Sequence, residues 1–333
     1  MILLHVLSKL YRNQMEKLLC GVDLGGTKLS VGLVQPDGTI YDKLVVYDHK
    51  DKDEIMIVDQ ITRLIKELIS RNGLIESDLI GIGMGFPGHV RYKDGHTLTS
   101  SNLKGFKNFP LRQALSEHFN IPVLLDNDAN AQAFCEYKFG AGKGYESMIF
   151  LTISTGIGAG IILDKKLYRG MTGTAGEFGH TIINSDNKQY CTCGNEGCVM
   201  ACACGLALPY LFKKKTEQGI RTILPLPADF HYSQIDGKMI MKGLEINDPL
   251  SKAIVDECAD YIGITVYNIF QIFNPPLIIL GGGLTCWGQS YLARIRKKFD
   301  ELARDMIFDR IDIVEANAGG DAGLIGAAAL ILE

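Results

Sequence analysis

The chain has 333 residues, of which 47% are hydrophobic and 22% charged, as in a folded protein large enough for two domains. Its net charge of −4 gives no electrostatic basis for nucleic acid or an anionic membrane surface as the main partner. No apolar run reaches the roughly 20 residues that a membrane-spanning helix needs. The 37 glycines lie in short turns rather than in repeats, which favours close approach of the backbone to ligands.

The first residues are apolar but do not form a secretory signal, because they lack leading positive charges and a small-residue cleavage site. Met15 lies directly before the first predicted strand, so we expect residues 1–14 to derive from an upstream start codon. The N-terminal extension as a whole is predicted to cover residues 1–17. It is too short for a helix-turn-helix domain.

The first half of the chain predicts three strands joined by turns, followed by alternating helices and strands. Apolar residues at helical spacing indicate the first helix, and Gly73 suits its C-terminal end. Strands are predicted at 18–22, 29–34, 40–46, 79–84 and 121–125, and helices at 51–70 and 111–119.

The second half also begins with a strand, a glycine turn and a returning strand. A long helix follows, with Asp248 as its N-cap, Pro249 at its first position and Asn274 before two prolines at its end. Strands are predicted at 147–153, 159–163, 277–280 and 311–314, and helices at 249–273, 290–304 and 322–332. We interpret the two halves as an internal duplication with a cleft between them, where ligands commonly bind.

Three glycine turns, at residues 23–28, 154–158 and 281–283, offer backbone N–H groups that suit phosphate oxygens. Asp23 could hold Mg²⁺. One glycine turn alone is no evidence of phosphate binding, because tight turns between strands commonly contain glycine. The prediction therefore depends on finding three such turns at corresponding places in the chain. The chain has no G-x-x-x-x-G-K-[ST] loop, and Pro87 with no following helix argues against a dinucleotide site at residues 81–85.

Residues 126–131, with the sequence D-N-D-A-N-A, lie where a predicted strand ends and a helix begins. In open α/β folds, ligands bind at that end of the sheet. A carboxylate there can accept a proton from a bound hydroxyl group, and the amides can orient that group. The alternative is that Asp126, Asn127 or Asp128 only caps the helix, since Asp and Asn are favoured N-cap residues.

His180, Cys191, Cys193 and Cys198 form the pattern H-x₁₀-C-x-C-x₄-C, which is typical of a closed tetrahedral zinc site. Such a metal would be structural and would hold His180 and the preceding Glu177 in place. Glu177 beside a metal-bound His could bind sugar hydroxyls, or it could be a solvated loop residue. Two further cysteines, Cys202 and Cys204, could replace a ligand but fit a following helix better. The remaining thiols are interpreted as small buried residues of a reducing, cytoplasmic compartment: Cys20, Cys135, Cys258 and Cys286.

These motifs together resemble the ROK family (repressor, open reading frame, kinase), within the actin-like and hexokinase-like ATPase superfamily, over residues 18–333. They are D-L-G-G-T-K at 23–28, G-F-P-G at 85–88, S-N-L at 101–103, D-N-D-A-N-A at 126–131, T-G-I-G-A-G at 155–160, G-E-F-G-H at 176–180, C-T-C-G-N-E-G-C at 191–198 and G-G-D-A-G-L-I-G-A-A at 319–328. The resemblance implies an α/β fold with two ribonuclease-H-like (actin-like ATPase) domains flanking a central cleft. The expected domains are 18–128, completed by a C-terminal helix at 318–333, and 129–317, with the zinc loop at 180–198.

The resemblance further implies ATP-dependent phosphorylation of a hexose, usually at its 6-hydroxyl group, by a cytoplasmic homodimer with Mg²⁺ and structural Zn²⁺. Asp128 matches the catalytic base. Sugar-binding positions are matched by Asn102, Asn127, Glu177 and His180, and metal positions by His180, Cys191, Cys193 and Cys198. Nucleotide contacts are matched by Asp23, Gly25, Gly26, Thr27, Lys28, Thr155, Gly156, Gly281, Gly282 and Gly283.

One position departs from the family pattern. Met200 stands two residues after the last cysteine of the zinc motif, where family kinases usually carry a Glu that contacts the sugar. A lost acceptor for a buried hydroxyl costs about 1–3 kcal/mol, so the sugar differs there or glucose binds less tightly. Glucose is the first expectation, with N-acetylmannosamine, allose or fructose as alternatives. A sugar sensor without catalysis and an actin-like polymer are further alternatives, and the missing DNA-binding domain favours a kinase.

Overall fold

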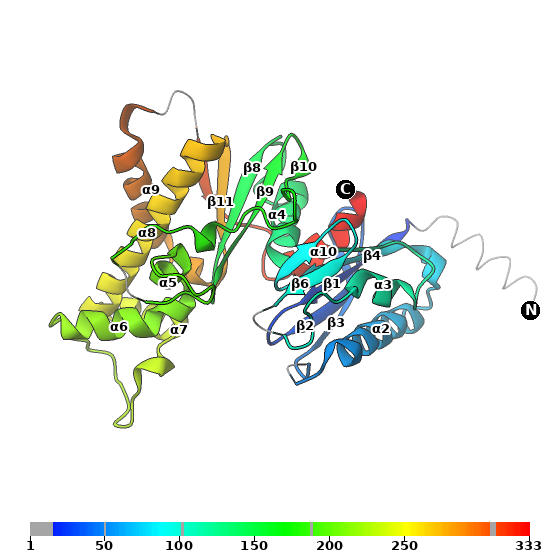
Figure 1. Cartoon of the computed structure of the whole chain (residues 1–333), viewed down its shortest axis with the longest axis horizontal. Helices are drawn as coiled ribbons and strands as arrows, with labels where there is room; N and C mark the ends of the chain where they lie inside the picture. Colours follow the sequence, from blue (N-terminus) through cyan, green and yellow to red (C-terminus); the bar gives the residue numbers. More distant parts are fainter. Residues whose placement is uncertain (1–15, 50, 101–102, 187–188, 307–310) are drawn as a thin grey trace, which may run out of the picture. The chain divides into compact units, whose positions relative to one another are not determined.

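A computed structural model describes residues 16–49, 51–100, 103–186, 189–306 and 311–333 (Figure 1). The chain divides into two compact units. Unit 1 contains the described residues up to Lys143, together with Lys166–Ala175 and Ala318–Glu333. Unit 2 contains Gly144–Lys165 and the described residues of Gly176–Asn317. The extension predicted at residues 1–14 lies outside the described residues.

Unit 1 contains a five-stranded sheet in which three antiparallel strands precede two parallel ones. The strand order is β3 (Ile40–Val46), β2 (Leu29–Val34), β1 (Leu18–Leu24), β4 (Leu79–Phe86) and β7 (Val123–Asn127). One face packs against α2 (Glu54–Arg71) and α3 (Leu111–Ser116), and the other against α4 (Asp128–Phe139) and α10 (Ala322–Ala329). A hairpin of β5 (His89–Arg91) and β6 (His96–Thr99), which the sequence analysis did not predict, completes the strands of this half.

The two faces of this sheet follow from the alternation of side chains along each strand. In β1, Cys20 and Val22 belong to the large core that packs against α2, whereas Leu19 packs with Ala328 of α10. Both faces are covered by helices, so the strand is apolar at almost every position rather than at every second one.

Glycines on the second face allow α10 to pack unusually close to the sheet. A Cβ atom at Gly83 would lie 1.8 Å from the carbonyl oxygen of Ala327, and one at Gly21 would lie 2.3 Å from that of Leu324. Gly81 and Gly85 lie on the same face, next to Ile331 and Ala131. The glycine spacing of residues 81–85 therefore has a packing role, consistent with the absence of a dinucleotide motif.

Unit 2 repeats the arrangement of unit 1 with strands in the order β9 (Ile157–Leu163), β8 (Met148–Ile153), β11 (Leu277–Gly281) and β12 (Asp312–Glu315). The first pair is antiparallel and the next two pairs are parallel, as in β2, β1, β4 and β7. The predicted internal duplication is thus confirmed. So is the α/β fold class with one mixed sheet in each half.

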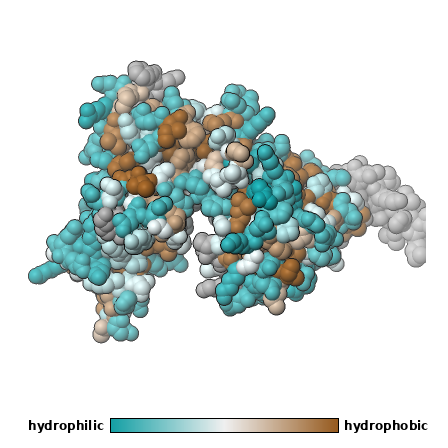
Figure 2. Space-filling model, in the orientation of Figure 1, coloured by the Kyte–Doolittle hydropathy of each residue, from teal (hydrophilic) through white to brown (hydrophobic). Residues whose placement is uncertain are grey.

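The helices of unit 2 surround α8 (Pro249–Phe273), which packs against α9 (Gln289–Ala303). Asp248 caps α8 by accepting a hydrogen bond from the Ser251 backbone at 2.7 Å, and Asn274 ends it with a left-handed φ of 43°, as predicted. Three further helices also contact α8: α5 (Val199–Ala203), α6 (Leu208–Glu217) and α7 (Gly237–Glu245). The helix expected after the cysteine motif is α5, which contains Cys202, whereas α6 and α7 were not predicted. The surface over α6 is mostly hydrophilic (Figure 2).

The structure divides the chain later than residue 128, the boundary that the sequence suggested. Unit 1 continues through α4 because this helix packs on α10: a Cβ atom at Gly326 would lie 1.9 Å from the Ala131 carbonyl oxygen. Lys166–Ala175, which begins with the two-residue strand β10 (Lys166–Leu167), also belongs to unit 1. Within the described parts of the chain, no helix combines the length and the apolar character that crossing a membrane requires.

Replacing Gly83 with Ala should destabilise unit 1 by at least about 3 kcal/mol, because the added methyl group collides with backbone that cannot move independently of α10. The measurement is the apparent free energy of unfolding in urea. Gly320→Ala is the matched control, since a Cβ atom there meets no atom within 4 Å. Equal stability of the two variants would contradict the close-packing interpretation.

Candidate active site

The D-N-D-A-N-A run joins the carboxyl end of β7 to the start of α4, as predicted. Asn127 is the N-cap: its Oδ1 accepts hydrogen bonds from the backbone of Ala129 at 2.8 Å and of Asn130 at 3.2 Å. Its Nδ2 donates to the Gly88 carbonyl oxygen at 3.0 Å. The capping alternative therefore applies to Asn127, whose amide is engaged at both ends, and its predicted role in sugar binding stays a prediction.

Asp126 and Asp128 have different surroundings. Asp126 is 1% exposed and accepts hydrogen bonds from Arg169 Nε at 2.7 Å, Asn130 Nδ2 at 2.8 Å and the Asn127 backbone at 2.7 Å. Burial raises the pKa of Asp126, and Arg169 opposes that rise. Asp128 is the first residue of α4 and only half-buried, and one of its oxygens accepts a hydrogen bond from the Ala129 backbone at 2.9 Å. Of the two carboxylates, Asp128 is thus the one accessible to a ligand.

The first glycine turn connects β1 to β2. It is closed by a hydrogen bond of 2.8 Å from the Gly25 backbone to the Lys28 carbonyl oxygen. His49, which is fully buried, donates from Nε2 to the Gly25 carbonyl oxygen at 2.8 Å. The sequence analysis missed His49, because a single histidine after a strand carries no motif; only its burial and this bond connect it to the turn.

Asp23 lies near the end of β1, beside this turn. Burial raises the pKa of its carboxyl group, with Lys28 lowering it and Asp321 adding to the rise. The first turn of α10 approaches the same group, since a Cβ atom at Gly323 would lie 2.9 Å from its oxygens. A partly desolvated carboxylate of this kind is an oxygen ligand that Mg²⁺ favours, so the residue fits its predicted role.

Within unit 1, strand register brings the predicted residues to one edge of the sheet. Asp23 pairs with Gly85, and Gly85 pairs with Asp126 on the other side. Position 85 also has no side chain that would separate β4 from Asp128, since a Cβ atom there would lie 3.5 Å from the Asp128 Cα. The phosphate-type turn and the candidate base therefore follow the carboxyl ends of strands in one sheet, where α/β proteins bind ligands. Asn102 lies outside the described residues.

In unit 2, the second and third glycine turns lie together. Gly282 has a left-handed φ of 91°, and a Cβ atom there would lie 2.4 Å from the Ile153 carbonyl oxygen at the end of β8. The turn after β8 is closed by a hydrogen bond of 2.8 Å from the Ser154 backbone to the Gly156 carbonyl oxygen. The structure thus brings Ile153 and Ser154, which directly precede Thr155 and Gly156, beside Gly282 and Gly283.

The four predicted metal ligands also lie together in unit 2. Their donor atoms all lie within 4.8 Å of one another, with 3.7 Å between the Sγ atoms of Cys193 and Cys198 and 3.4 Å between Cys191 Sγ and His180 Nδ1. Tetrahedral Zn²⁺ with bonds of about 2.0–2.3 Å needs ligand separations of about 3.5–3.8 Å, so the set fits this metal.

The surplus cysteines are separate from this group. Cys202 lies in α5 and Cys204 ends it, both buried, and neither belongs to the four-ligand cluster. Burial raises the pKa of the Cys198 thiol, and its contact with Cys193 adds to that rise, so a bound cation would favour the thiolate form of Cys198. Cys286 is exposed, contrary to the prediction, because it lies on the outer side of the turn η5 (Gly283–Trp287).

His180 lies in the short turn η2 (Phe178–His180), with its two ring nitrogens on different neighbours. Nδ1 faces Cys191, and Nε2 lies 3.9 Å from a carboxylate oxygen of Glu177, which is half-exposed. Nδ1 can therefore bind a metal while Nε2 is free to form a hydrogen bond with a bound substrate.

Met200 packs beside the glycine turn at residues 154–158 and beside the G-E-F-G-H motif. Its methyl group would lie 3.4 Å from a Cβ atom at Gly156 and 3.2 Å from one at Gly179, and its sulfur accepts from Thr192 Oγ1 at 3.5 Å. An apolar side chain thus stands beside Gly179, which lies in the chain between Glu177 and His180, the two polar candidates for sugar binding in unit 2.

Comparison with known proteins agrees with this arrangement. The sequence model of the ROK family matches residues 19–333. A glucokinase of Halalkalibacterium halodurans is 31% identical over 318 residues, which cover 96% of this chain and 96% of that protein. A xylose repressor of Caldicellulosiruptor bescii is 31% identical over 321 residues, covering 95% of this chain and 78% of the repressor.

Among solved structures, a ROK family glucokinase from Streptomyces griseus in complex with glucose and AMPPNP has a TM-score of 0.78 and 34% sequence identity. The similarity covers 94% of this chain and 98% of that one. The chain therefore belongs to the ROK family, and the resemblance found in the sequence is confirmed. Kinases and repressors are both among its relatives.

Proposed function

We propose that this protein is an ATP-dependent hexose kinase that transfers the γ-phosphate of ATP to the 6-hydroxyl group of its sugar, with glucose as the first candidate. The observation that carries the proposal is the position of Asp128. It is a half-buried carboxylate at the carboxyl end of β7, and the capping of α4 is done by Asn127 instead. Relatives named glucokinase that match along nearly their whole length support the same activity.

In the proposed mechanism, Asp128 accepts the proton of the sugar hydroxyl as that oxygen attacks the γ-phosphorus in line with the departing ADP. Glu177 and His180 Nε2 orient the sugar, together with Asn102 and Asn127. Asp23 would hold Mg²⁺, which would supply positive charge opposite the phosphate oxygens. The backbone N–H groups of the glycine turns add fixed donors that need no reorganisation during the reaction.

The remaining assignments follow from this activity. Gly25, Gly26, Thr27 and Lys28 of unit 1 would contact the phosphates of ATP. In unit 2, the residues proposed to contact the nucleotide are Thr155, Gly156, Gly281, Gly282 and Gly283. It also includes a homodimer located in the cytoplasm, with a structural zinc ion on His180 and three cysteines.

A second candidate function is sugar sensing without phosphorylation. Repressors among the relatives support it, as does Met200, which replaces a carboxylate that family kinases usually carry. Measuring ADP release across a panel of hexoses and amino sugars separates the two candidates. Sugar-dependent ADP release supports the kinase. Sugar binding by calorimetry with no ADP release from any bound sugar supports the sensor.

Asp128→Asn should lower kcat by about 100- to 10,000-fold, because the amide cannot accept the hydroxyl proton, while sugar affinity changes little. Steady-state kinetics with the preferred sugar and calorimetric sugar binding measure the two effects. Asp59→Asn, an exposed position on α2, is the control and should match the wild type. A kcat of Asp128→Asn close to that of the wild type would exclude Asp128 as the base.

Met200→Glu should lower the KM for glucose by about tenfold or more, because a carboxylate accepting from a buried hydroxyl contributes about 1.5–3 kcal/mol. The measurement is KM and kcat for glucose and for the other sugars of the panel. Met200→Leu controls for the loss of the thioether and should leave the KM for glucose unchanged. If Met200→Glu binds glucose no better than Met200→Leu does, the side chain at 200 does not face the sugar.

The purified protein should contain about one zinc ion per chain, and Cys198→Ser should abolish binding and lower the melting temperature. Metal analysis and thermal unfolding with and without a chelator test this. Acidification should also release the metal, because protonated imidazole and thiol groups do not bind it, so affinity falls as pH falls. Cys286→Ser, at an exposed cysteine outside the cluster, should keep the metal.

A further inference from the structure

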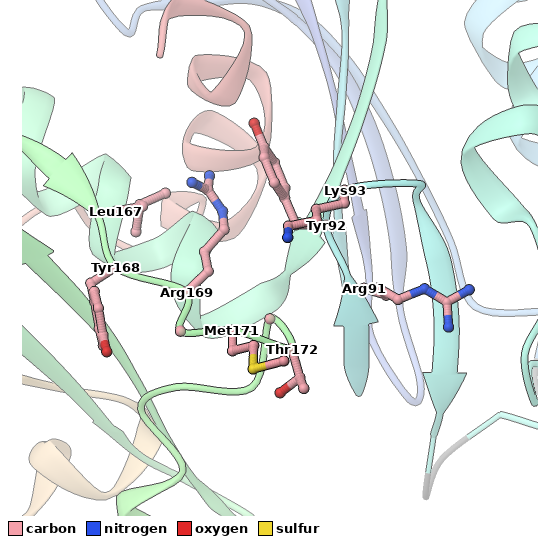
Figure 3. A pocket seen from close by; sticks show the side chains of 10 residues that line it. Arg91, Tyr92, Lys93, Leu167, Tyr168, Arg169, Met171 and Thr172 are labelled. Atoms are coloured by element: carbon pink, nitrogen blue, oxygen red, sulfur yellow. The ribbon is translucent and has the colours of Figure 1, made fainter.

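Arg169 forms a partly enclosed ion-pair cluster in unit 1 that no motif accounts for. Its Nε donates to Asp126 at 2.7 Å, its Nη1 donates to Glu333 at 3.0 Å, and its Nη2 also pairs with Glu333. The guanidinium group lies over the ring of Tyr92, 3.7 Å from its centre. Figure 3 shows Arg169 and Tyr92 side by side at a cavity of about 420 Å³. We call Arg169, Asp126, Glu333 and Tyr92 the Arg169 cluster.

The cluster is shielded from water, so its geometry is strongly constrained. The side chains of Arg169, Asp126 and Glu333 are 12%, 2% and 16% exposed. A guanidinium group has fixed donor directions and here engages both carboxylates through a planar fork, which a lysine ammonium does not provide. Removing it would leave two carboxylates facing each other with little water, which displaces them or forces one to take up a proton.

Hydrogen bonds connect this cluster to Asn127 and Asn130, the residues on either side of the candidate base in the chain. The Asp126 oxygen that does not meet Arg169 accepts from the backbone of Asn127 and from the side chain of Asn130. Those two residues form the N-terminus of α4, because Asn127 Oδ1 accepts from the Asn130 backbone. Asp128 lies between them. Displacing Asp126 would therefore shift the turn of backbone that carries the Asp128 carboxylate.

The cluster also anchors the segment that contains Arg169. The Arg169 carbonyl oxygen accepts from the Ala175 backbone at 3.1 Å. Gly173, with a left-handed φ of 87°, packs so closely that a Cβ atom would lie 2.2 Å from the Val90 carbonyl oxygen. This segment continues in the chain directly into Gly176 and Glu177. Within unit 1, Arg169 thus holds the Lys166–Ala175 segment to Asp126, the residue that precedes Asn127 and Asp128.

We infer that Arg169 is a positioning residue for phosphoryl transfer: by bridging Asp126 and Glu333, it holds the start of α4 so that the Asp128 carboxylate meets the sugar hydroxyl. The inference rests on the proposed kinase activity. Arg169 itself touches neither substrate in this assignment. Its effect should appear in turnover rather than in substrate affinity, because misplacement of a catalytic group by about 1 Å costs about 100-fold in rate.

The experiment compares Arg169→Met, Arg169→Lys and Glu333→Gln with the wild type in the full-length protein. Arg91→Met is the matched control, because Arg91 lines the same cavity but pairs with the exposed Asp94. Arg169→Met should lower kcat by about 10- to 100-fold with both KM values within about threefold. Arg169→Lys should recover part of the loss, because it keeps the charge but not the bridge. Arg91→Met should match the wild type.

Amide hydrogen exchange in peptides covering residues 124–134 gives a second readout that does not depend on turnover. Exchange there should be faster in Arg169→Met and unchanged in Arg91→Met. If the wild type phosphorylates no sugar, the kinase proposal fails, and this exchange measurement alone decides whether Arg169 holds the start of α4. If Arg169→Met does not fold, the same kcat and exchange measurements are made on Arg169→Lys and Glu333→Gln and compared with the wild type. A kcat within twofold of the wild type in the folded Arg169 variants, or unchanged exchange, overturns the inference.

Discussion

The candidate site of unit 1 depends on the close packing of α10 against the glycine face of β1 and β4. Because Gly21 and Gly83 have no side chains, the helix lies with its backbone against the strands. The same packing brings α4 onto α10 and therefore fixes the helix that begins with Asp128. Strand register then places Asp23, Gly85 and Asp126 side by side at the carboxyl edge of the sheet. The positions of the candidate site residues in unit 1 are therefore set by the packing of backbone against backbone.

The second constraint is that three neighbouring polar residues, Asp126, Asn127 and Asp128, have different hydrogen-bond partners and different burial. Asp126 is buried in an ion pair, Asn127 caps the helix, and Asp128 keeps access to solvent. Three adjacent residues with similar side chains thus have three different environments, and only Asp128 among them combines a carboxylate with access to solvent. In unit 2, His180 has a comparable dual position, with one nitrogen at the cysteine cluster and the other near Glu177.

Several features were predictable because they depend on residues a few positions apart. Asp248, Pro249 and Asn274 mark both ends of α8 through local hydrogen bonds and backbone preference. The cysteine spacing indicated a metal cluster, since a short loop keeps its ligands close together. By contrast, the two short helices α6 and α7, which lie between residues 208 and 245, were missed. Their apolar residues pack around α8 in a pattern too brief to show a clear period.

The sequence by itself determined the α/β class, the internal duplication, the family and most residues of the candidate site, because these are recorded in local patterns and ordered motifs. Only the tertiary structure decided that Asn127 rather than Asp128 caps α4, that unit 1 extends to Lys143, and that His49 supports the first glycine turn. It also revealed the pairing of Arg169 with Asp126 and Glu333. Asn127 and Asp128 are adjacent and both are favoured N-cap residues, so the local sequence does not decide between them. For the other contacts the physical reason is distance along the chain: they join residues tens to hundreds of positions apart, and their energies arise only when the packed sheet and helices bring them together.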